Sequence, residues 1–174
     1  MTQPERTVMQ MAYVVENMEQ ALERWLQKIK VGPFFVLKSL AAENMRYRGE
    51  PTNLDIDVAL GFSGNLCIEL IQQNCDSPSV YRELLQCQGP GFHHWGLYSE
   101  TFDEDVLRYQ QQNHELAFSG KVSVGARFAY MDTVKDLGGM LELIEVTPVV
   151  SDLFHNMESA HWDWDGRDPV RYVG

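Results

Sequence analysis

The chain has 174 residues and a mass of 20.0 kDa, with 44% hydrophobic and 22% charged residues, a composition that suits one folded domain and excludes wholesale disorder. Fourteen Lys and Arg against 25 Asp and Glu give a net charge of −11, which makes a nucleic acid or an anionic membrane surface an unfavourable partner. Three cysteines without a Cys-x-x-Cys pair indicate neither a disulfide framework nor a zinc ribbon.

The first part of the chain is predicted to form a strand, a helix and three more strands. Residues 7–15 are rich in β-forming side chains. Asn17 is a helix N-cap, and the apolar residues after it follow the spacing of an amphipathic helix, which Gly32-Pro33 ends. The three further strands are predicted over residues 34–40, 54–62 and 66–72, and the last two are joined by a turn at residues 63–65.

After a connector, the same order of elements begins again. The connector is a short helix that starts at Ser77-Pro78 and ends at Gly89-Pro90-Gly91. A strand over residues 92–99, a helix capped by Thr101 and strands over residues 116–122, 126–132 and 140–146 follow. The remaining tail contains an aromatic stretch, Trp162 to Pro169, which we expect to pack on the body because burial of Trp is favourable.

The two halves align residue by residue as an internal repeat. Setting Gln10 against His94 aligns the strand and helix of both halves without a gap, and the closing strands place Glu69 on Glu142. The offset is 84 residues at the front and 73 at the back, so the first half has eleven extra residues between its ends. A repeat of this length indicates two copies of one supersecondary unit, here βαβββ, that bury their faces together.

These features resemble the vicinal oxygen chelate superfamily. The resemblance rests on the tandem modules, the segment Gly91–Gly96 (GFHHWG) and the closing segment Gly138–Glu145 (GGMLELIE). The superfamily includes glyoxalase I, methylmalonyl-CoA epimerase, extradiol dioxygenases, fosfomycin-modifying enzymes and bleomycin-binding proteins. The resemblance implies an α+β fold in which tandem βαβββ modules form a curled, open, eight-stranded mixed sheet around one cavity. The expected organisation is a single domain over residues 1–174, with module 1 at 7–75, a connector helix at 76–91, module 2 at 92–148 and a C-terminal tail at 149–174.

The resemblance also implies a metal site, because the superfamily takes ligands from the first and fourth strands of each module. The corresponding residues are Gln10, Glu69, His94 and Glu142. Each is a polar side chain in an apolar strand, whose burial alone would cost a few kcal/mol without a partner. One imidazole, two carboxylates and an amide oxygen suit one divalent transition metal ion, Zn, Ni, Co, Mn or Fe.

The ligand set is most similar to that of eukaryotic glyoxalase I, in which it holds zinc. It differs at two positions from the His, Gln, His, Glu set of methylmalonyl-CoA epimerase. The dioxygenases resemble a two-His-one-carboxylate iron site, from which Gln10 departs.

The implied function is a glyoxalase-type lyase, isomerase or epimerase that acts on a small carbonyl compound through an enediolate or enolate held on the metal. Glu142 is the first choice of general base, and Glu69 is placed to return the proton. A hydrophobic or aromatic substrate would be accommodated by apolar side chains of the curled sheets, namely Phe34, Phe35, Tyr47, Phe128 and Tyr130.

Two other functions stay open. One is a metal-free small-molecule binder of the bleomycin-resistance type, and the other is an extradiol-type dioxygenase. Taken singly, each of the four residues also has a structural reading: a glutamate could be a solvated carboxylate, and Gln10 could be a core amide.

The remaining histidines are not expected to take part in chemistry. Strand alternation predicts that His93 points to the face opposite His94. His114 is expected at the surface, and His155 and His161 are expected to dock the tail.

The remaining expectations concern location and assembly. No apolar run reaches the eighteen or so residues that a membrane span requires, and Met1–Arg6 lacks the layout of a signal peptide. We therefore expect a cytoplasmic protein with reduced thiols. The resemblance further implies a homodimer.

Overall fold

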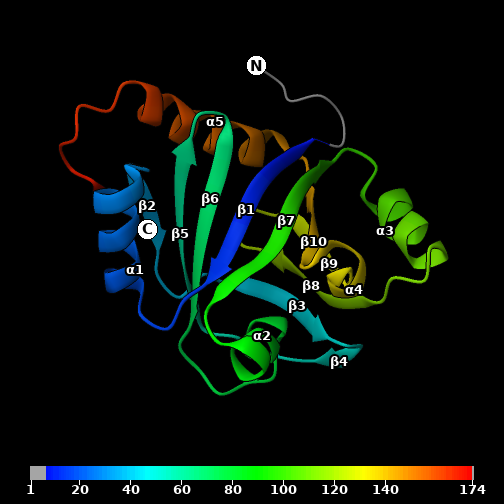
Figure 1. Ribbon diagram of the computed structural model, residues 1–174. Helices are drawn as coiled ribbons and strands as arrows, with labels where there is room; N and C mark the ends of the chain where they lie inside the picture. Colours follow the sequence, from blue (N-terminus) through cyan, green and yellow to red (C-terminus); the bar gives the residue numbers. More distant parts are fainter. Residues whose placement is uncertain (1–6, 174) are drawn as a thin grey trace.

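A computed structural model describes residues 7–173; Met1–Arg6, on which the signal-peptide prediction rests, and Gly174 lie outside the described residues. The described chain contains one strongly curled, mixed sheet of eleven strands in the order β11-β2-β5-β6-β1-β7-β10-β9-β8-β3-β4 (Figure 1). The strands are β1 (Val8–Val14), β2 (Phe34–Leu37), β3 (Ala42–Tyr47), β4 (Glu50–Pro51), β5 (Ile56–Ser63), β6 (Leu66–Gln73), β7 (Gly91–Ser99), β8 (Leu116–Val122), β9 (Arg127–Met131), β10 (Met140–Glu145) and β11 (Val170–Tyr172). The helices are α1 (Met18–Arg24), η1 (Trp25–Ile29), α2 (Val80–Gln88), α3 (Phe102–Gln111), α4 (Val134–Leu137) and α5 (Pro148–Trp162).

The sheet is built from two equivalent halves that meet at β1 and β7. Each half has four strands in the same spatial order, β2-β5-β6-β1 and β8-β9-β10-β7. In module 1 Ala12 of β1 lies beside Glu69 of β6, and in module 2 Gly96 of β7 lies beside Glu142 of β10. These pairs are related by the two offsets of the sequence repeat. The predicted α+β fold of tandem modules is confirmed, and three strands, β3, β4 and β11, add to the eight that were expected.

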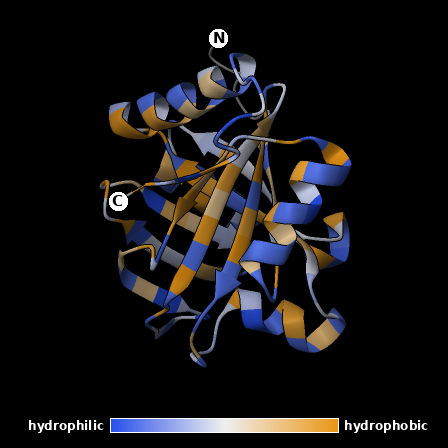
Figure 2. Cartoon of the chain, turned by 90° about the vertical axis from the view of Figure 1, so that its left-hand side faces the viewer, coloured by the Kyte–Doolittle hydropathy of each residue, from blue (hydrophilic) through white to orange (hydrophobic). Residues whose placement is uncertain are grey.

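Two amphipathic helices cover the outer face of the sheet, one on each module. Helix α1 is capped by Asn17, whose side chain accepts a hydrogen bond from the backbone N–H of Gln20. It continues into the π-helical turn η1 and packs Met18 and Leu22 against module 1. Helix α3 covers module 2 on the opposite side of the molecule (Figure 1). Figure 2 shows many hydrophobic residues in the strands. The helices carry many hydrophilic residues.

The inner face of the curl is filled by alternate residues of the strands together with side chains of α2 and α5. The helices contribute Val80 and Tyr81 from α2 and Met157 from α5, all of them buried. Aromatic rings from both modules meet there, among them Phe62, Phe118 and Tyr130. The first and fourth strands of each module, which carry the predicted ligands, are the four central strands of the sheet.

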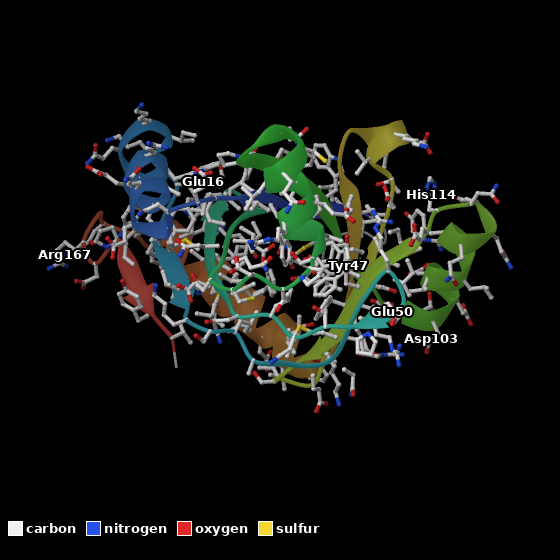
Figure 3. All side chains as sticks on the ribbon, turned by 90° about the horizontal axis from the view of Figure 1, so that it is seen from below. Glu16, Tyr47, Glu50, Asp103, His114 and Arg167 are labelled. Carbon is white, nitrogen blue, oxygen red and sulfur yellow. The ribbon has the colours of Figure 1, made fainter. Side chains whose placement is uncertain are left out.

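The extra residues of module 1 form a hairpin that crosses to module 2. Strand β3 follows β2 in the chain, yet it pairs with β8 at the far edge of the sheet, where Tyr47 lies opposite Phe118. Figure 3 accordingly shows Glu50 on the same side of the molecule as Asp103 and His114, whereas Glu16 lies on the other side. We call residues 42–51 the crossing hairpin. Because it joins the two halves, it closes one side of the curl.

The tail packs on the body through a helix and a strand, but Trp162 of the aromatic stretch is 63% exposed, so the expected burial is wrong for this residue. Thr147 caps α5, and Met157 of this helix is buried in the inner core. His161 accepts a hydrogen bond from the N–H of Gly64 at 3.3 Å and donates one to the carbonyl of Gly32 at 2.9 Å. Strand β11 then pairs in parallel with β2. Within residues 7–173, no helix combines the length and apolar character needed to cross a membrane.

Candidate metal centre

The four predicted ligands come together at the centre of the inner face. Gln10, Glu69, His94 and Glu142 come from β1, β6, β7 and β10, which are neighbours in the sheet. Gln10 is 2% exposed and His94 is fully buried. The side chains of Glu69 and Glu142 are 12% and 9% exposed. Sequence reasoning therefore identified four side chains that the fold brings into one buried cluster, here called the central cluster.

The polar ends of the central cluster are in mutual contact. Nε2 of Gln10 lies 2.8 Å from Oε2 of Glu69, 3.1 Å from Oε2 of Glu142 and 3.3 Å from Nε2 of His94. Nε2 of His94 lies 3.3 Å from the Glu69 carboxylate and 3.1 Å from that of Glu142. Among the described residues, the two glutamates and His94 form a group whose donor atoms lie within 4.8 Å of one another.

The backbone around the cluster is shaped to admit these side chains. A Cβ atom added to Gly96 would lie 2.7 Å from Cβ of Gln10, closer than carbon atoms can approach. The absence of a side chain at Gly96 thus makes room for the amide of Gln10. In the other module the repeat places Ala12, another small residue, directly opposite His94.

Charge is concentrated in this small volume. Burial alone would lower the pKa of His94, but the carboxylates of Glu142 and Glu69 outweigh burial and raise it to about 9. Burial and the neighbouring charge of Glu142 raise the pKa of Glu69 above its ordinary value. Two buried carboxylates that share one imidazole form a site with excess negative charge.

The donor set fits a divalent ion. Ligands about 2.1 Å from a common ion lie roughly 3.0 to 3.4 Å apart in octahedral or tetrahedral geometry, and the distances from Nε2 of His94 to the carboxylates of Glu69 and Glu142, 3.3 and 3.1 Å, lie in this range. Two carboxylates also balance the charge of one divalent cation. Oε1 of Gln10 has no hydrogen-bond partner among residues 7–173, although this side chain is buried. A half-turn of the amide would bring that oxygen beside the carboxylates, a repulsive arrangement unless a cation lies between them.

His93 lies beside His94, contrary to the prediction that it faces the other way. In the ladder between β1 and β7, Ala12 pairs with His94 and Tyr13 pairs with Phe92, so His93 is the extra residue of a β-bulge. The bulge breaks strand alternation and turns the ring inward, where it is 2% exposed. Burial, with a smaller contribution from His94, lowers the pKa of His93 well below its ordinary value, which keeps this ring neutral.

Two tyrosines border the central cluster on the inner side. Tyr81 of α2 and Tyr130 of β9 are 3% and 2% exposed, and their hydroxyl oxygens lie 3.0 Å apart. The ring of Tyr130 meets that of His94 edge to face, with centroids 4.8 Å apart. Burial and the charges of Glu69 and Glu142 raise the pKa of both hydroxyls well above the ordinary value. The pair contains two protons and one mutual hydrogen bond, so one O–H is left to donate elsewhere.

The chain matches a known family over most of its length. The sequence pattern described as the glyoxalase/bleomycin resistance protein/dioxygenase superfamily matches residues 9–130. The chain belongs to this superfamily. The resemblance to vicinal oxygen chelate proteins is thereby confirmed. No curated protein sequence matches the chain.

Solved structures share this superfamily fold at low sequence identity. A methylmalonyl-CoA epimerase from Mycobacterium tuberculosis has a TM-score of 0.59 at 16% identity, covering 87% of this chain and 97% of the epimerase. A hypothetical protein from Bacillus halodurans C-125 has a TM-score of 0.58 at 16% identity, with 81% and 94% covered. A methylmalonyl-CoA epimerase in complex with methylmalonyl-CoA has a TM-score of 0.53 at 14% identity, with 82% and 95% covered. At these identities the likeness shows the superfamily fold alone.

Four of the five aromatic side chains expected to accommodate a substrate lie at the inner core. Phe35, Tyr47, Phe128 and Tyr130 pack in or against the inner core, but Phe34 belongs to the outer cluster under α1, so its expected place at the cavity is wrong. The error follows from strand alternation, because Phe34 and Phe35 are neighbours on β2 and must face opposite ways.

The remaining histidines lie away from the central cluster contacts. His155 is exposed, and His114, expected at the surface, is half-buried and contacts the carbonyl of Asp132. Sequence reasoning missed Tyr81, whose only signal was an aromatic residue in the first turn of the connector helix.

Proposed function

We propose that the chain is a divalent-metal-dependent enzyme that moves a proton beside the carbonyl group of a small substrate, as an isomerase, epimerase or lyase. The observation that carries the proposal is the convergence of Gln10, Glu69, His94 and Glu142 on one point in the buried centre of the sheet. The superfamily to which the chain belongs supports it. Glyoxalases and methylmalonyl-CoA epimerases, which belong to this superfamily, are functional parallels.

In this proposal the four side chains hold the ion, and two of them also handle protons. A bound divalent ion would supply Lewis acidity, which lowers the barrier to removing a proton next to a carbonyl. Glu142 takes that proton, and Glu69, its counterpart in the other module, returns one. The two carboxylates come from opposite sides of the β1–β7 pair, so they can serve opposite faces of one substrate carbon.

In this proposal the tyrosine pair donates a hydrogen bond to the substrate. Tyr81 and Tyr130 together retain one O–H that is not used within their own hydrogen bond. Because burial and the nearby glutamates keep both hydroxyls protonated, this O–H can donate to an oxygen of the substrate as negative charge develops there.

The surroundings favour a neutral, ring-bearing substrate. Phe118 of β8 and Phe128 of β9 form ring contacts with each other and with Tyr130, and Tyr47 of β3 packs against the same core. No lysine or arginine is buried in the described part of the chain. Arg48 of the crossing hairpin is already paired with Glu83, Glu115 and Asp132. An anionic group would find no free buried countercharge.

Proton exchange in deuterated water tests this function directly. Metal-loaded protein is incubated with a panel of aryl ketones, α-hydroxy ketones and thioesters, methylmalonyl-CoA among them, and loss of the α-proton signal is followed by NMR. We expect exchange with at least one compound in the wild type and a fall of about 10² to 10⁴ in Glu142→Gln, the usual contribution of a general base. In Glu69→Gln, exchange should persist while product formation slows.

Glu145→Gln is the matched control, because Glu145 lies three residues further along β10 and pairs with Arg127. Full exchange in Glu142→Gln would place the base elsewhere. Absence of exchange across the panel, with or without metal, would contradict the proposed reaction class.

A metal-free binding protein is the second candidate, and one observation favours it. Both carboxylates of the central cluster have partners without an ion, because the amide nitrogen of Gln10 donates to both and His94 contacts both. A protein that binds aromatic compounds with equal affinity before and after metal removal would support this alternative. Consumption of oxygen with a catechol and ferrous iron would instead identify the dioxygenase reaction.

A further inference from the structure

The rings of His93 and His94 are joined by a direct hydrogen bond between two nitrogen atoms. Nδ1 of His93 lies 2.8 Å from Nδ1 of His94. The other nitrogen of His93, Nε2, lies 3.2 Å from the backbone carbonyl of Val80. A chain of three groups thus runs from the first residue of α2 to His94 of the central cluster.

The proton positions in this chain follow from its two ends. A carbonyl oxygen only accepts, so Nε2 of His93 must carry a proton and donate it to Val80. One proton lies between the two Nδ1 atoms. A neutral His93 with its proton on Nε2 has a lone pair on Nδ1, so the shared proton belongs to His94. His94 therefore carries a proton on Nδ1, and its Nε2 is the nitrogen that faces Gln10, Glu69 and Glu142.

The fold fixes His93 in this role by several independent contacts. The β-bulge at His93 turns its ring to the same face as that of His94. The ring packs against Tyr81 and Tyr130, with centroid distances of 5.1 and 5.8 Å. Val80, which provides the acceptor, is fully buried directly after the N-cap Ser79. The ring consequently has little freedom to turn and exchange its two nitrogens.

We infer that His93 is a positioning residue, which fixes the tautomer and orientation of His94 so that Nε2 is directed at the metal. The inference deepens the proposed function and rests on it for the identity of the ligand that His94 binds. Histidines that bind metals generally donate their second ring N–H to a neighbouring acceptor, and loss of that acceptor typically costs 10- to 100-fold in metal affinity. A neutral histidine as the acceptor, itself anchored on a helix carbonyl, couples the start of α2 to the metal centre.

NMR of the metal-free protein tests the hydrogen bond without any metal or substrate. With ¹⁵N-labelled histidine, an N–H···N bond produces a scalar coupling between the two nitrogen nuclei. We expect this coupling between Nδ1 of His94 and Nδ1 of His93, with the proton attached to His94. A proton attached to Nδ1 of His93, or no coupling at all, would overturn the inference whether or not the protein binds metal.

Metal affinity tests the consequence for the site. Zn²⁺ binding is measured by competition with a chromophoric chelator for the wild type, His93→Phe and His93→Gln. Phe keeps a ring between Tyr81 and Tyr130 but cannot accept, so we expect affinity to fall 10- to 100-fold. Gln offers an oxygen to His94 and an N–H to Val80, so we expect it to restore most of the affinity.

The outcomes separate the inference from the proposed function. Equal affinity of His93→Phe and the wild type would overturn the positioning role and leave the metal site intact. Equal losses in Phe and Gln variants would show that His93 acts through packing alone, which also overturns it. A wild type that shows the nitrogen–nitrogen coupling but binds no metal would refute the proposed function and still support the positioning of His94.

Discussion

At the scale of single residues, the central cluster is a costly arrangement in the absence of an ion. Burying a carboxylate beside another carboxylate is unfavourable, and two such groups, Glu69 and Glu142, lie with His94 inside an apolar core. Apolar side chains at these positions would be more favourable for folding alone. The presence of a carboxylate at the equivalent position of both modules therefore indicates a function at this point.

Gly96→Ala tests the space reserved for Gln10. The added methyl group would lie 2.7 Å from Cβ of Gln10, so the amide must move away from the cluster. We expect the free energy of unfolding to fall by about 1 to 3 kcal/mol, the usual cost of overpacking, and metal affinity to fall as well. Gly91→Ala is the control on the same strand, because an added Cβ there meets nothing within 4 Å. Equal behaviour of the two variants would show that the close approach at Gly96 is unimportant.

Asp57 is expected to make the free energy of unfolding depend on pH. Burial alone would raise the pKa of this carboxyl, but hydrogen bonds from Lys38 at 2.7 Å and from the N–H of Ser39 at 2.9 Å outweigh it and lower the pKa. A lowered folded-state pKa stabilises the protein above the unfolded pKa of about 3.9, and this contribution is lost as the pH falls through the folded-state pKa.

We therefore expect Asp57→Asn to lower the free energy of unfolding by about 1 to 3 kcal/mol at pH 7, with the difference from the wild type shrinking below roughly pH 4. Urea denaturation over a pH series measures this. A difference that stays constant down to pH 3 would contradict the assignment.

At the scale of elements, the sequence predicted the strands that carry clear alternation and missed the segments that break it. Strands 116–122 and β8 coincide, and the equivalence of Glu69 and Glu142 followed from the repeat. The crossing hairpin was missed because residues 42–51 lack an apolar pattern and include left-handed residues at Asn44 and Arg48. The inward turn of His93 was missed because alternation assumes a regular ladder and a bulge leaves no local signature in the sequence.

Arg48 is expected to fasten the crossing hairpin to the rest of the protein. Its guanidinium contacts Glu83 of α2 at 2.6 Å, Glu115 at 2.6 Å and Asp132 at 3.0 Å. Arg48→Gln leaves three carboxylates without their shared cation, so amide protons of β3 should exchange with solvent at least about tenfold faster. Arg46→Gln, which removes only a hydrogen bond to the carbonyl of Gly49, is the control. Unchanged exchange in Arg48→Gln would show that backbone pairing with β8 holds the hairpin by itself.

At the scale of the whole molecule, the two modules, the crossing hairpin and the tail together enclose one inner face. The pseudo-symmetric halves bring two predicted ligands each to the centre, and α5 covers the curl with Met157. The resemblance to the vicinal oxygen chelate superfamily, mapped through the sequence repeat, predicted that these four side chains meet. The repeat did not predict the order of strands at the edges of the sheet, because edge pairing depends on long-range contacts. The predicted homodimer and cytoplasmic location stay predictions.

Truncation after Pro148 is expected to destabilise the whole molecule. It removes α5 and β11, exposing the side chains that pack on Met157 and Phe154 and leaving the edge of β2 unpaired. We expect a clear loss of unfolding temperature and of solubility. Truncation after Trp162 keeps α5, and the loss should be smaller. A shortened chain ending at Pro148 with the wild-type unfolding temperature would show that the tail is dispensable.

Metal stoichiometry and affinity measurements test whether the central cluster binds a divalent ion. Protein stripped with a chelator and reconstituted with Zn²⁺ or Co²⁺ is examined by elemental analysis and calorimetric titration. We expect one ion per chain, and His94→Ala should remain folded but lose at least tenfold in affinity. His155→Ala, at an exposed histidine, should bind like the wild type. A wild type that takes up no ion after reconstitution, or a His94→Ala variant with undiminished affinity, would contradict the account.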